Sequence, residues 1–155
     1  MTKMLTCLAL LLAAPAAASQ ITAPDGPGEH TIINDSAAMR RLLHNSGITL
    51  QWIGFETPAR GHVRVFELNG QYRLTGSQAA RRGGGRVTVD GVVLAIDARS
   101  FTFRGRIVIT DTPDPGRNCV RDGTYEFRAT GTRRYWRLQQ MEACDGLTDY
   151  VDIYF

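Results

Sequence analysis

The feature that most constrains the fold is a pair of cysteines, Cys119 and Cys144, at the two ends of a predicted β-hairpin. Residues 124–129 and 132–140 alternate between apolar and polar side chains, as strands with one buried face do. Thr130-Gly131 lies between them and predicts a two-residue turn, because glycine adopts positive φ at little cost. In that register the two cysteines lie close together, so we predict a disulfide that adds about 3–3.5 kcal/mol in the chain-entropy model.

The same register predicts which side chains face one another across the hairpin. Tyr125 lies opposite Trp136 on one face, and Glu126 lies opposite Tyr135 on the other. Aromatic pairs and opposite charges in such positions each contribute about 0.2–1 kcal/mol.

The outer face of this hairpin is the strongest candidate for a partner-binding site. It carries Arg128, Arg133, Tyr135 and Arg137. An exposed aromatic ring between guanidinium groups can bind an anionic small molecule, a glycan or a protein partner. The alternative is a solvated face on which Glu126 neutralises part of the charge.

Residues 1–19 have the pattern of a secretory signal peptide. Lys3 precedes an apolar run, and small residues suited to signal peptidase follow at positions 16–19. The run is too short to anchor the chain in a bilayer. We therefore expect an exported protein, in a bacterial periplasm or outside the cell, where disulfides form and persist. Cys7 lies in this leader, so the mature chain would keep only Cys119 and Cys144.

The charge of the chain does not favour nucleic acid as a partner. The formal net charge is +3, and loss of Lys3 with the leader lowers it by one, to +2. A protein that binds nucleic acid through charge has a far more basic surface.

The rest of the chain divides into a lead-in and one domain. Residues 20–34 are rich in proline and glycine and predict a flexible lead-in, and residues 35–155 predict a single β-rich domain. Asp35 or Ser36 can cap a helix that runs to about Asn45. From residue 48 onward, short runs of alternating apolar residues predict strands. These runs are 48–53, 62–68, 71–75, 87–89, 92–96, 100–110 and 148–155, besides the C-terminal hairpin.

Two dipeptides, Asn69-Gly70 and Asp90-Gly91, are strong signals for tight hairpin turns. Short turns join antiparallel strands, whereas parallel strands need long crossovers. The sequence therefore predicts a mainly β fold. It is a small antiparallel β-barrel or sandwich of about nine short strands, with one N-terminal α-helix and a disulfide.

No pattern of residues predicts a catalytic, cofactor-binding or metal-binding site. The nucleophile motif G-x-S-x-G is absent, and the three histidines are not spaced as zinc ligands. Asp149 and Asp152 fall on opposite faces of the last predicted strand, so we interpret them as solubilising charges or as partners for nearby arginines. We expect a non-catalytic binding or envelope-associated module without a cofactor.

Two alternatives remain open at this point. Residues 151–155 resemble the closing strand of bacterial outer-membrane β-barrels, with alternating apolar residues and a terminal Phe155. Strands of such barrels have about 9–11 residues, which is longer than most of the runs predicted here. The second alternative is a secreted hydrolase with a carboxylate site that the spacing does not reveal.

Overall fold

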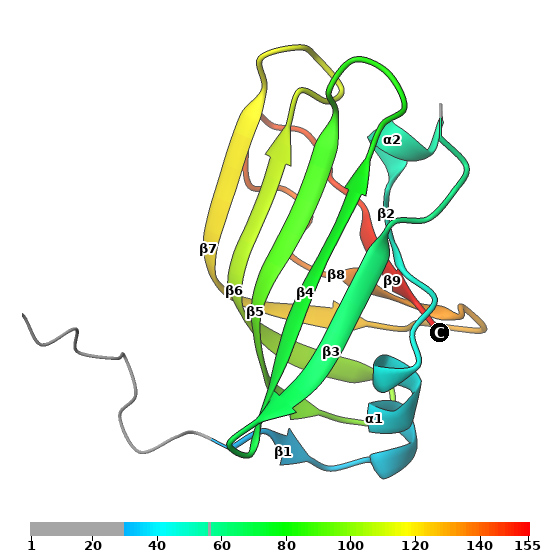
Figure 1. The fold of residues 1–155 in the computed structure, drawn as a ribbon, viewed down its shortest axis with the longest axis vertical. Helices are drawn as coiled ribbons and strands as arrows, with labels where there is room; N and C mark the ends of the chain where they lie inside the picture. The colour runs from blue at the N-terminus through cyan, green and yellow to red at the C-terminus, as the bar shows by residue number, and fades with distance from the viewer. Residues whose placement is uncertain (1–29, 56) are drawn as a thin grey trace, which may run out of the picture.

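The computed structural model describes residues 30–55 and 57–155 of the chain. These residues contain nine strands and two helices (Figure 1). The predicted signal peptide and residues 20–29 of the predicted lead-in lie outside this part. In chain order the elements are β1 (Ile32–Ile33), α1 (Ser36–Leu43), β2 (Ile48–Leu50), α2 (Gln51–Gly54), β3 (His62–Leu68), β4 (Gln71–Ala79), β5 (Arg86–Ile96), β6 (Ser100–Thr110), β7 (Asn118–Arg128), β8 (Tyr135–Leu138) and β9 (Val151–Tyr154).

The strands form one sheet in the order β2-β9-β8-β7-β6-β5-β4-β3. Neighbours along this path are antiparallel, and β1 adds to β5 in the parallel direction. The sheet curls until β2 meets the chain just before β3. There the N–H of Gly61 donates to the carbonyl of Ile48 at 2.8 Å. The predicted antiparallel β fold is confirmed, in the form of a nearly closed barrel.

A buried glutamine completes the closure. The side chain of Gln78 on β4 is 2% exposed. Its Oε1 accepts a hydrogen bond from the N–H of Leu50 at 2.8 Å, and its Nε2 donates to the carbonyl of Ala59 at 3.0 Å. These bonds satisfy backbone groups that a strand edge would otherwise leave unpaired.

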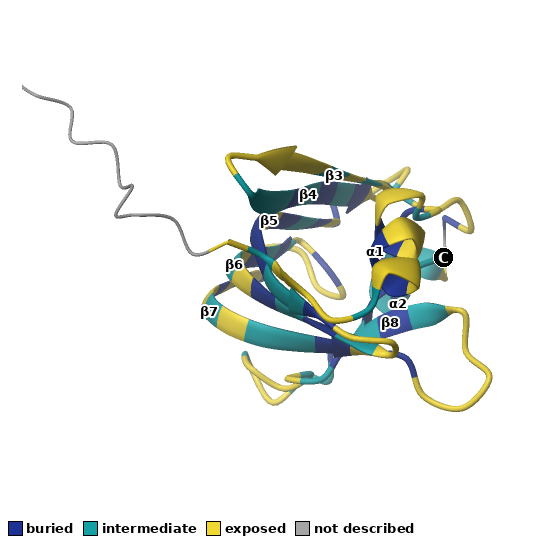
Figure 2. Cartoon of the chain, turned by 90° about the horizontal axis from the view of Figure 1, so that it is seen from below, coloured by how far each residue is buried: buried dark blue, intermediate teal, exposed yellow. Residues whose placement is uncertain are grey.

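Apolar side chains fill the barrel. Figure 2 shows the buried residues as dark blue bands along the strands and on α1. The strand predicted over residues 100–110 is β6, and its predicted inward residues Phe101, Phe103, Ile107 and Ile109 are buried. Such alternation follows from the two-residue period of a strand.

Helix α1 lies at the lower end of the barrel, beside β3 (Figures 1 and 2). Its predicted cap is confirmed, since the Asp35 carboxylate accepts a hydrogen bond from the N–H of Ala38 at 2.6 Å. Ala38, Met39 and Leu42 bury the inner face of the helix in the core. The cap and the apolar stripe together define where this helix begins and which face it buries.

The predicted hairpin at Asn69-Gly70 is confirmed. Both residues have positive φ, 53° and 81°, as a tight hairpin turn of this type requires. Val65 lies opposite Leu74, as that turn requires.

The predicted hairpin at Asp90-Gly91 is wrong, because both residues lie in the middle of β5. Gly91 pairs with Gly105 of β6, and a Cβ atom at Gly91 would lie 2.2 Å from the carbonyl oxygen of Arg104. The glycine therefore allows two strands to approach closely and does not form a turn. The chain reverses later, where the N–H of Asp97 donates to the carbonyl of Ser100 at 2.8 Å.

The strand predicted over residues 48–53 is correct only as far as Leu50, where α2 begins. The side chain of Gln51 binds the C-terminal segment through two hydrogen bonds. Its Nε2 donates to the carbonyl of Thr148 at 2.6 Å, and its Oε1 accepts from the N–H of Tyr150 at 2.7 Å. Contacts between residues far apart in sequence override the local alternation here.

The predicted disulfide is confirmed. The sulfur atoms of Cys119 and Cys144 are 2.06 Å apart, and their Cα atoms are 5.8 Å apart. The bond connects the start of β7 to the long segment between β8 and β9, which carries Asp149 and Tyr150.

The predicted register of the C-terminal hairpin is wrong by four residues. Phe127 pairs with Leu138 and Arg128 with Arg137, so the connection between β7 and β8 is longer than two residues. Arg99 holds this connection, since its Nη2 donates to the carbonyl of Gly131 at 2.7 Å.

Two predicted pairs, Tyr125 with Trp136 and Glu126 with Tyr135, are therefore absent from the described structure. A shift by an even number of residues keeps every side chain on its predicted face. Trp136 is fully buried in the core, and Tyr135 on the other face is not.

Candidate functional site

The outer wall of the barrel carries a row of aligned polar side chains across four neighbouring strands. Arg128 of β7 pairs with Arg137 of β8, which pairs with Asp152 of β9, which pairs with Thr49 of β2. Paired residues on adjacent strands project from the same face of the sheet. The flanking residues of β2 and β9 are buried in the core, so this row faces outward.

Arg137 and Asp152 form the centre of this row. The Nε and Nη2 atoms of Arg137 donate to the two carboxylate oxygens of Asp152 at 2.8 and 2.7 Å. The side chains are 18% and 6% exposed, so the pair is largely shielded from water. Its hydrogen bonds raise the pKa of Arg137 above the ordinary value, against the opposing effect of burial. Two parallel bonds fix both groups in one plane.

Aromatic rings surround the pair. The Arg137 guanidinium lies 4.1 Å from the ring centre of Tyr150 and 5.2 Å from that of Tyr135. Tyr135 contacts Tyr154, with ring centres 5.2 Å apart, and the guanidinium of Arg60 lies 3.7 Å from the centre of the Tyr154 ring. These contacts hold the rings in place on the wall.

Three of the four residues predicted as a partner-binding site lie together in this region. The guanidinium groups of Arg133 and Arg137 lie 5.6 and 5.2 Å from the centre of the Tyr135 ring. Arg128 is near Arg137 in the sheet, but its guanidinium pairs with Glu126 at 2.6 Å. Glu126 thus neutralises part of the face, as the alternative interpretation states.

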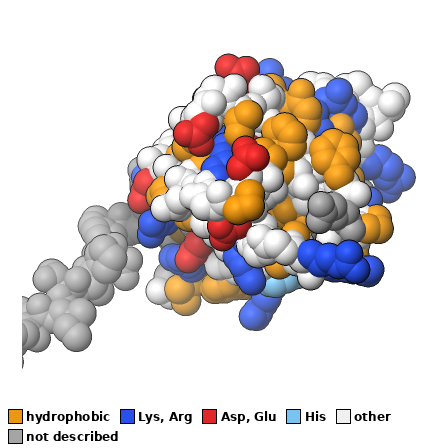
Figure 3. Space-filling view, turned by 90° about the horizontal axis from the view of Figure 1, so that it is seen from above, with side chains coloured by type: hydrophobic (Ala, Val, Ile, Leu, Met, Phe, Trp, Pro, Cys, Tyr) orange, Lys and Arg blue, Asp and Glu red, His pale blue; other side chains and the backbone are white. Residues whose placement is uncertain are grey.

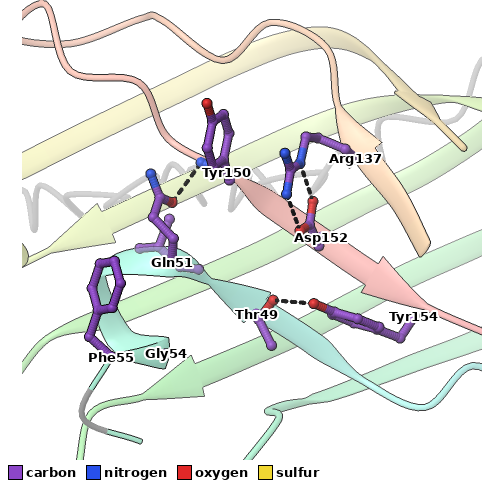
Figure 4. A pocket seen from close by; sticks show the side chains of 9 residues that line it. Thr49, Gln51, Gly54, Phe55, Arg137, Tyr150, Asp152 and Tyr154 are labelled. Carbon is purple, nitrogen blue, oxygen red and sulfur yellow. Dashed lines mark hydrogen bonds and ion pairs between the residues drawn. The ribbon is translucent and has the colours of Figure 1, made fainter. Parts of the chain in front are cut away.

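A cleft of about 330 Å³ opens over β2, α2 and β9. Its two most exposed aromatic side chains are Phe55, which is 80% exposed, and Tyr150, which is 37% exposed. Figure 4 shows Gln51 between them, and Arg137 and Asp152 facing each other beside Tyr150. The cleft is lined by Thr49, Leu50, Gln51, Gly54, Phe55, Arg137, Tyr150, Asp152 and Tyr154.

A buried ionic cluster supports one end of the cleft. Asp149 is fully buried and accepts hydrogen bonds from Arg117 at 2.9 and 3.0 Å, from Arg121 at 2.6 Å and from the Trp52 ring nitrogen at 2.9 Å. Burial disfavours the charged carboxylate, but the bonds from Arg117 and Trp52 and the attraction of both arginines outweigh it. The pKa of Asp149 therefore lies below its ordinary value.

The cluster tests the interpretation of the two C-terminal aspartates. Asp149 and Asp152 are partners of arginines, as predicted, but both are buried, so their description as solubilising charges is wrong.

In residues 30–55 and 57–155, no group of three His, Cys, Asp or Glu side chains is arranged to hold a metal ion. Within the same residues neither helix has the length and apolar surface needed to cross a bilayer.

A second hollow of about 320 Å³ is lined by residues at the end of the barrel that carries α2. Figure 1 shows where α2 lies, at the upper end of the barrel. Hydrophobic side chains lie among charged ones on this end, as Figure 3 shows. Trp52, Pro113 and Pro115 line the hollow, and Phe55 lines both the hollow and the cleft.

A family model described as the PM1083 family matches residues 30–155. The chain belongs to the PM1083 family. One relative is the "Uncharacterized protein PM1083" of Pasteurella multocida (strain Pm70), which is 36% identical over 121 residues, covering 74% of each chain. No solved structure matches the chain.

The segment matched by the PM1083 family model contains every residue of the cleft and of the buried cluster. The sequence pattern does not single out Phe55 or Tyr150, because it predicts a strand where α2 forms and assigns Tyr150 to no face. A signal for Tyr150 existed, since it alternates with Asp152 and Tyr154 at the two-residue period of a strand.

Proposed function

We propose that this member of the PM1083 family is an exported, non-catalytic binding module of the cell envelope, and that the cleft beside β9 is its ligand site. The observation that carries the proposal is the combination of exposed Phe55 and Tyr150 with the fixed pair of Arg137 and Asp152. Binding sites of this kind combine aromatic surface with a few polar groups held in place.

The disulfide supports export. A bond between Cys119 and Cys144 persists in an oxidising compartment and is rare in the cytosol. The signal-peptide pattern of residues 1–19 agrees with this compartment.

The chemistry of the cleft supports binding over catalysis. Asp152 is the carboxylate that lines the cleft, and both of its oxygens accept hydrogen bonds from Arg137. These two bonds fix the orientation of the carboxylate toward the Arg137 guanidinium, so it serves as a fixed polar group of the cleft. The hydrolase alternative needs two converging carboxylates, whereas Asp149 is committed to the buried arginines.

Fractionation of the producing bacterium, combined with counting of free thiols, tests export. We expect the full-length chain to be released with periplasmic or secreted proteins, with leader removal and no free thiol. Recovery in the cytosol with reduced cysteines contradicts the proposal. Recovery in outer membranes with heat-modifiable migration on gels supports the outer-membrane alternative instead.

Co-sedimentation with isolated cell envelopes tests binding. We expect the wild-type protein to sediment with envelopes and the Phe55→Ala and Tyr150→Ala variants to remain largely in the supernatant. Phe66→Ala is the matched control, because Phe66 is an exposed phenylalanine on β3, outside the cleft. Equal sedimentation of all four proteins would exclude the cleft as the site.

A further inference from the structure

The hydrogen-bonding groups of the cleft floor include both donors and acceptors. Arg137 uses Nε and Nη2 for Asp152, and the described structure has no protein partner for its Nη1 amino group. Each Asp152 oxygen keeps a further lone pair beyond its bond to Arg137. Beside them, Thr49 donates its hydroxyl to the Tyr154 hydroxyl at 3.3 Å, which leaves the Tyr154 proton to donate.

The charge of the floor disfavours an anionic ligand. The carboxylate of Asp152 neutralises Arg137 and repels a second anion at short distance. An ionised carboxylate or phosphate ligand has no hydrogen-bond donor, so it could not bond to the free lone pairs of Asp152. Hydroxyl groups both donate and accept, so they match the floor better than an anion does.

The aromatic rings supply a second kind of contact. Arg137 covers one face of Tyr150, and in Figure 4 Phe55 lies on the opposite side of that ring. The negatively polarised face of an aromatic ring attracts C–H groups, and sugar rings carry such groups on their faces. The strongly exposed ring of Phe55 offers a similar surface at the same end of the cleft.

We infer that the cleft binds a neutral saccharide, with a sugar ring packed against Phe55 and Tyr150 and its hydroxyl groups bonded to Arg137 and Asp152. This inference rests on the proposed function and narrows its ligand to one chemical class. The volume of about 330 Å³ lies near the lower end of ligand pockets, about 300–1,000 Å³, so the cleft holds one or two sugar units of a longer chain.

A glycan array that carries both neutral and acidic oligosaccharides tests the inference with the full chain. We expect binding to neutral glycans and at least about tenfold weaker binding to uronate-containing, sialylated or sulfated glycans of equal length. Calorimetric titration of the best neutral glycan then measures the contribution of each ring. Phe55→Ala and Tyr150→Ala should each weaken binding about tenfold, as central aromatic contacts do, whereas Phe66→Ala should have no effect.

Tyr150→Phe separates stacking from hydrogen bonding, and it should keep most of the affinity. Binding confined to acidic glycans, or no binding to any glycan, overturns the inference. If envelope co-sedimentation persists in that case, the binding function stands and only the ligand class is wrong. If co-sedimentation is also lost, both are wrong.

Discussion

Arg137 and Asp152 face each other on the neighbouring strands β8 and β9, joined by two hydrogen bonds of 2.8 and 2.7 Å on the outer wall of the barrel. Each residue alone would be a charge on a partly shielded surface. Together they form a planar, charge-balanced group that serves as the floor of the cleft.

Replacing Asp152 with asparagine should change ligand preference and stability together. Asp152→Asn keeps the size of the side chain but leaves the Arg137 charge uncompensated, so relative binding of acidic over neutral glycans should rise. The weakened pair should lower the free energy of unfolding by about 1–3 kcal/mol in urea denaturation. Asp90→Asn is the control, because Asp90 pairs with Arg73 in an exposed position and should cost under about 1 kcal/mol. Equal losses in both variants would contradict the role assigned to the pair.

Asp149 should make the protein sensitive to acid. Its pKa is lower in the folded state than in the unfolded state, so the unfolded chain binds more protons as pH falls. The stabilisation is fully present above the unfolded pKa of about 3.9 and is lost as pH falls through the lower folded value. The stability gap between wild type and Asp149→Asn should therefore be largest near pH 7 and narrow below about pH 4. Denaturant titrations across this range measure the gap, and parallel curves would disprove the assignment.

Local patterns predicted the parts of the fold in which one short segment decides the outcome. The Asn69-Gly70 turn, the Asp35 cap and strand β6 depend on neighbouring residues, and all three are correct. The disulfide is also correct, because residues 119 and 144 lie close together over a range of hairpin registers.

The errors share one physical origin, which is contact between distant segments. Arg99 holds the loop before β8 and so sets the hairpin register, and Gln51 binds the C-terminal segment and so ends β2. The cleft forms where α2 meets β9, about a hundred residues later in the chain, so no single stretch of sequence contains it. Only the predicted partner-binding residues can be recognised from one stretch of sequence, because they lie within a few residues of each other. They are Arg128, Arg133, Tyr135 and Arg137.

Gly91→Ala should destabilise the barrel although alanine is the smallest change available. The added Cβ atom would lie 2.2 Å from a backbone oxygen of β6 and 2.7 Å from the Cα atom of Gly105. Neither backbone atom can move without separating the strands, so we expect a loss of about 1–3 kcal/mol in urea denaturation. Gly54→Ala is the matched control, because its Cβ would meet nothing within 4 Å, and it should be neutral or slightly stabilising. A neutral Gly91→Ala variant would contradict the close approach of β5 and β6.

Loss of the disulfide should weaken both the fold and the cleft. The bond joins β7 to the segment that carries Asp149 and Tyr150, so without it this segment gains freedom in the unfolded chain and in the folded protein. The Cys119→Ala/Cys144→Ala double variant should lose about 3 kcal/mol of unfolding free energy. Envelope binding should fall further than the unfolded fraction explains, because Tyr150 is no longer held beside Arg137. Reduction of the wild-type protein by dithiothreitol provides the control, since it should reproduce both effects without any substitution. If reduced, still-folded protein binds envelopes as well as oxidised protein, the disulfide stabilises the barrel and has no part in holding the cleft.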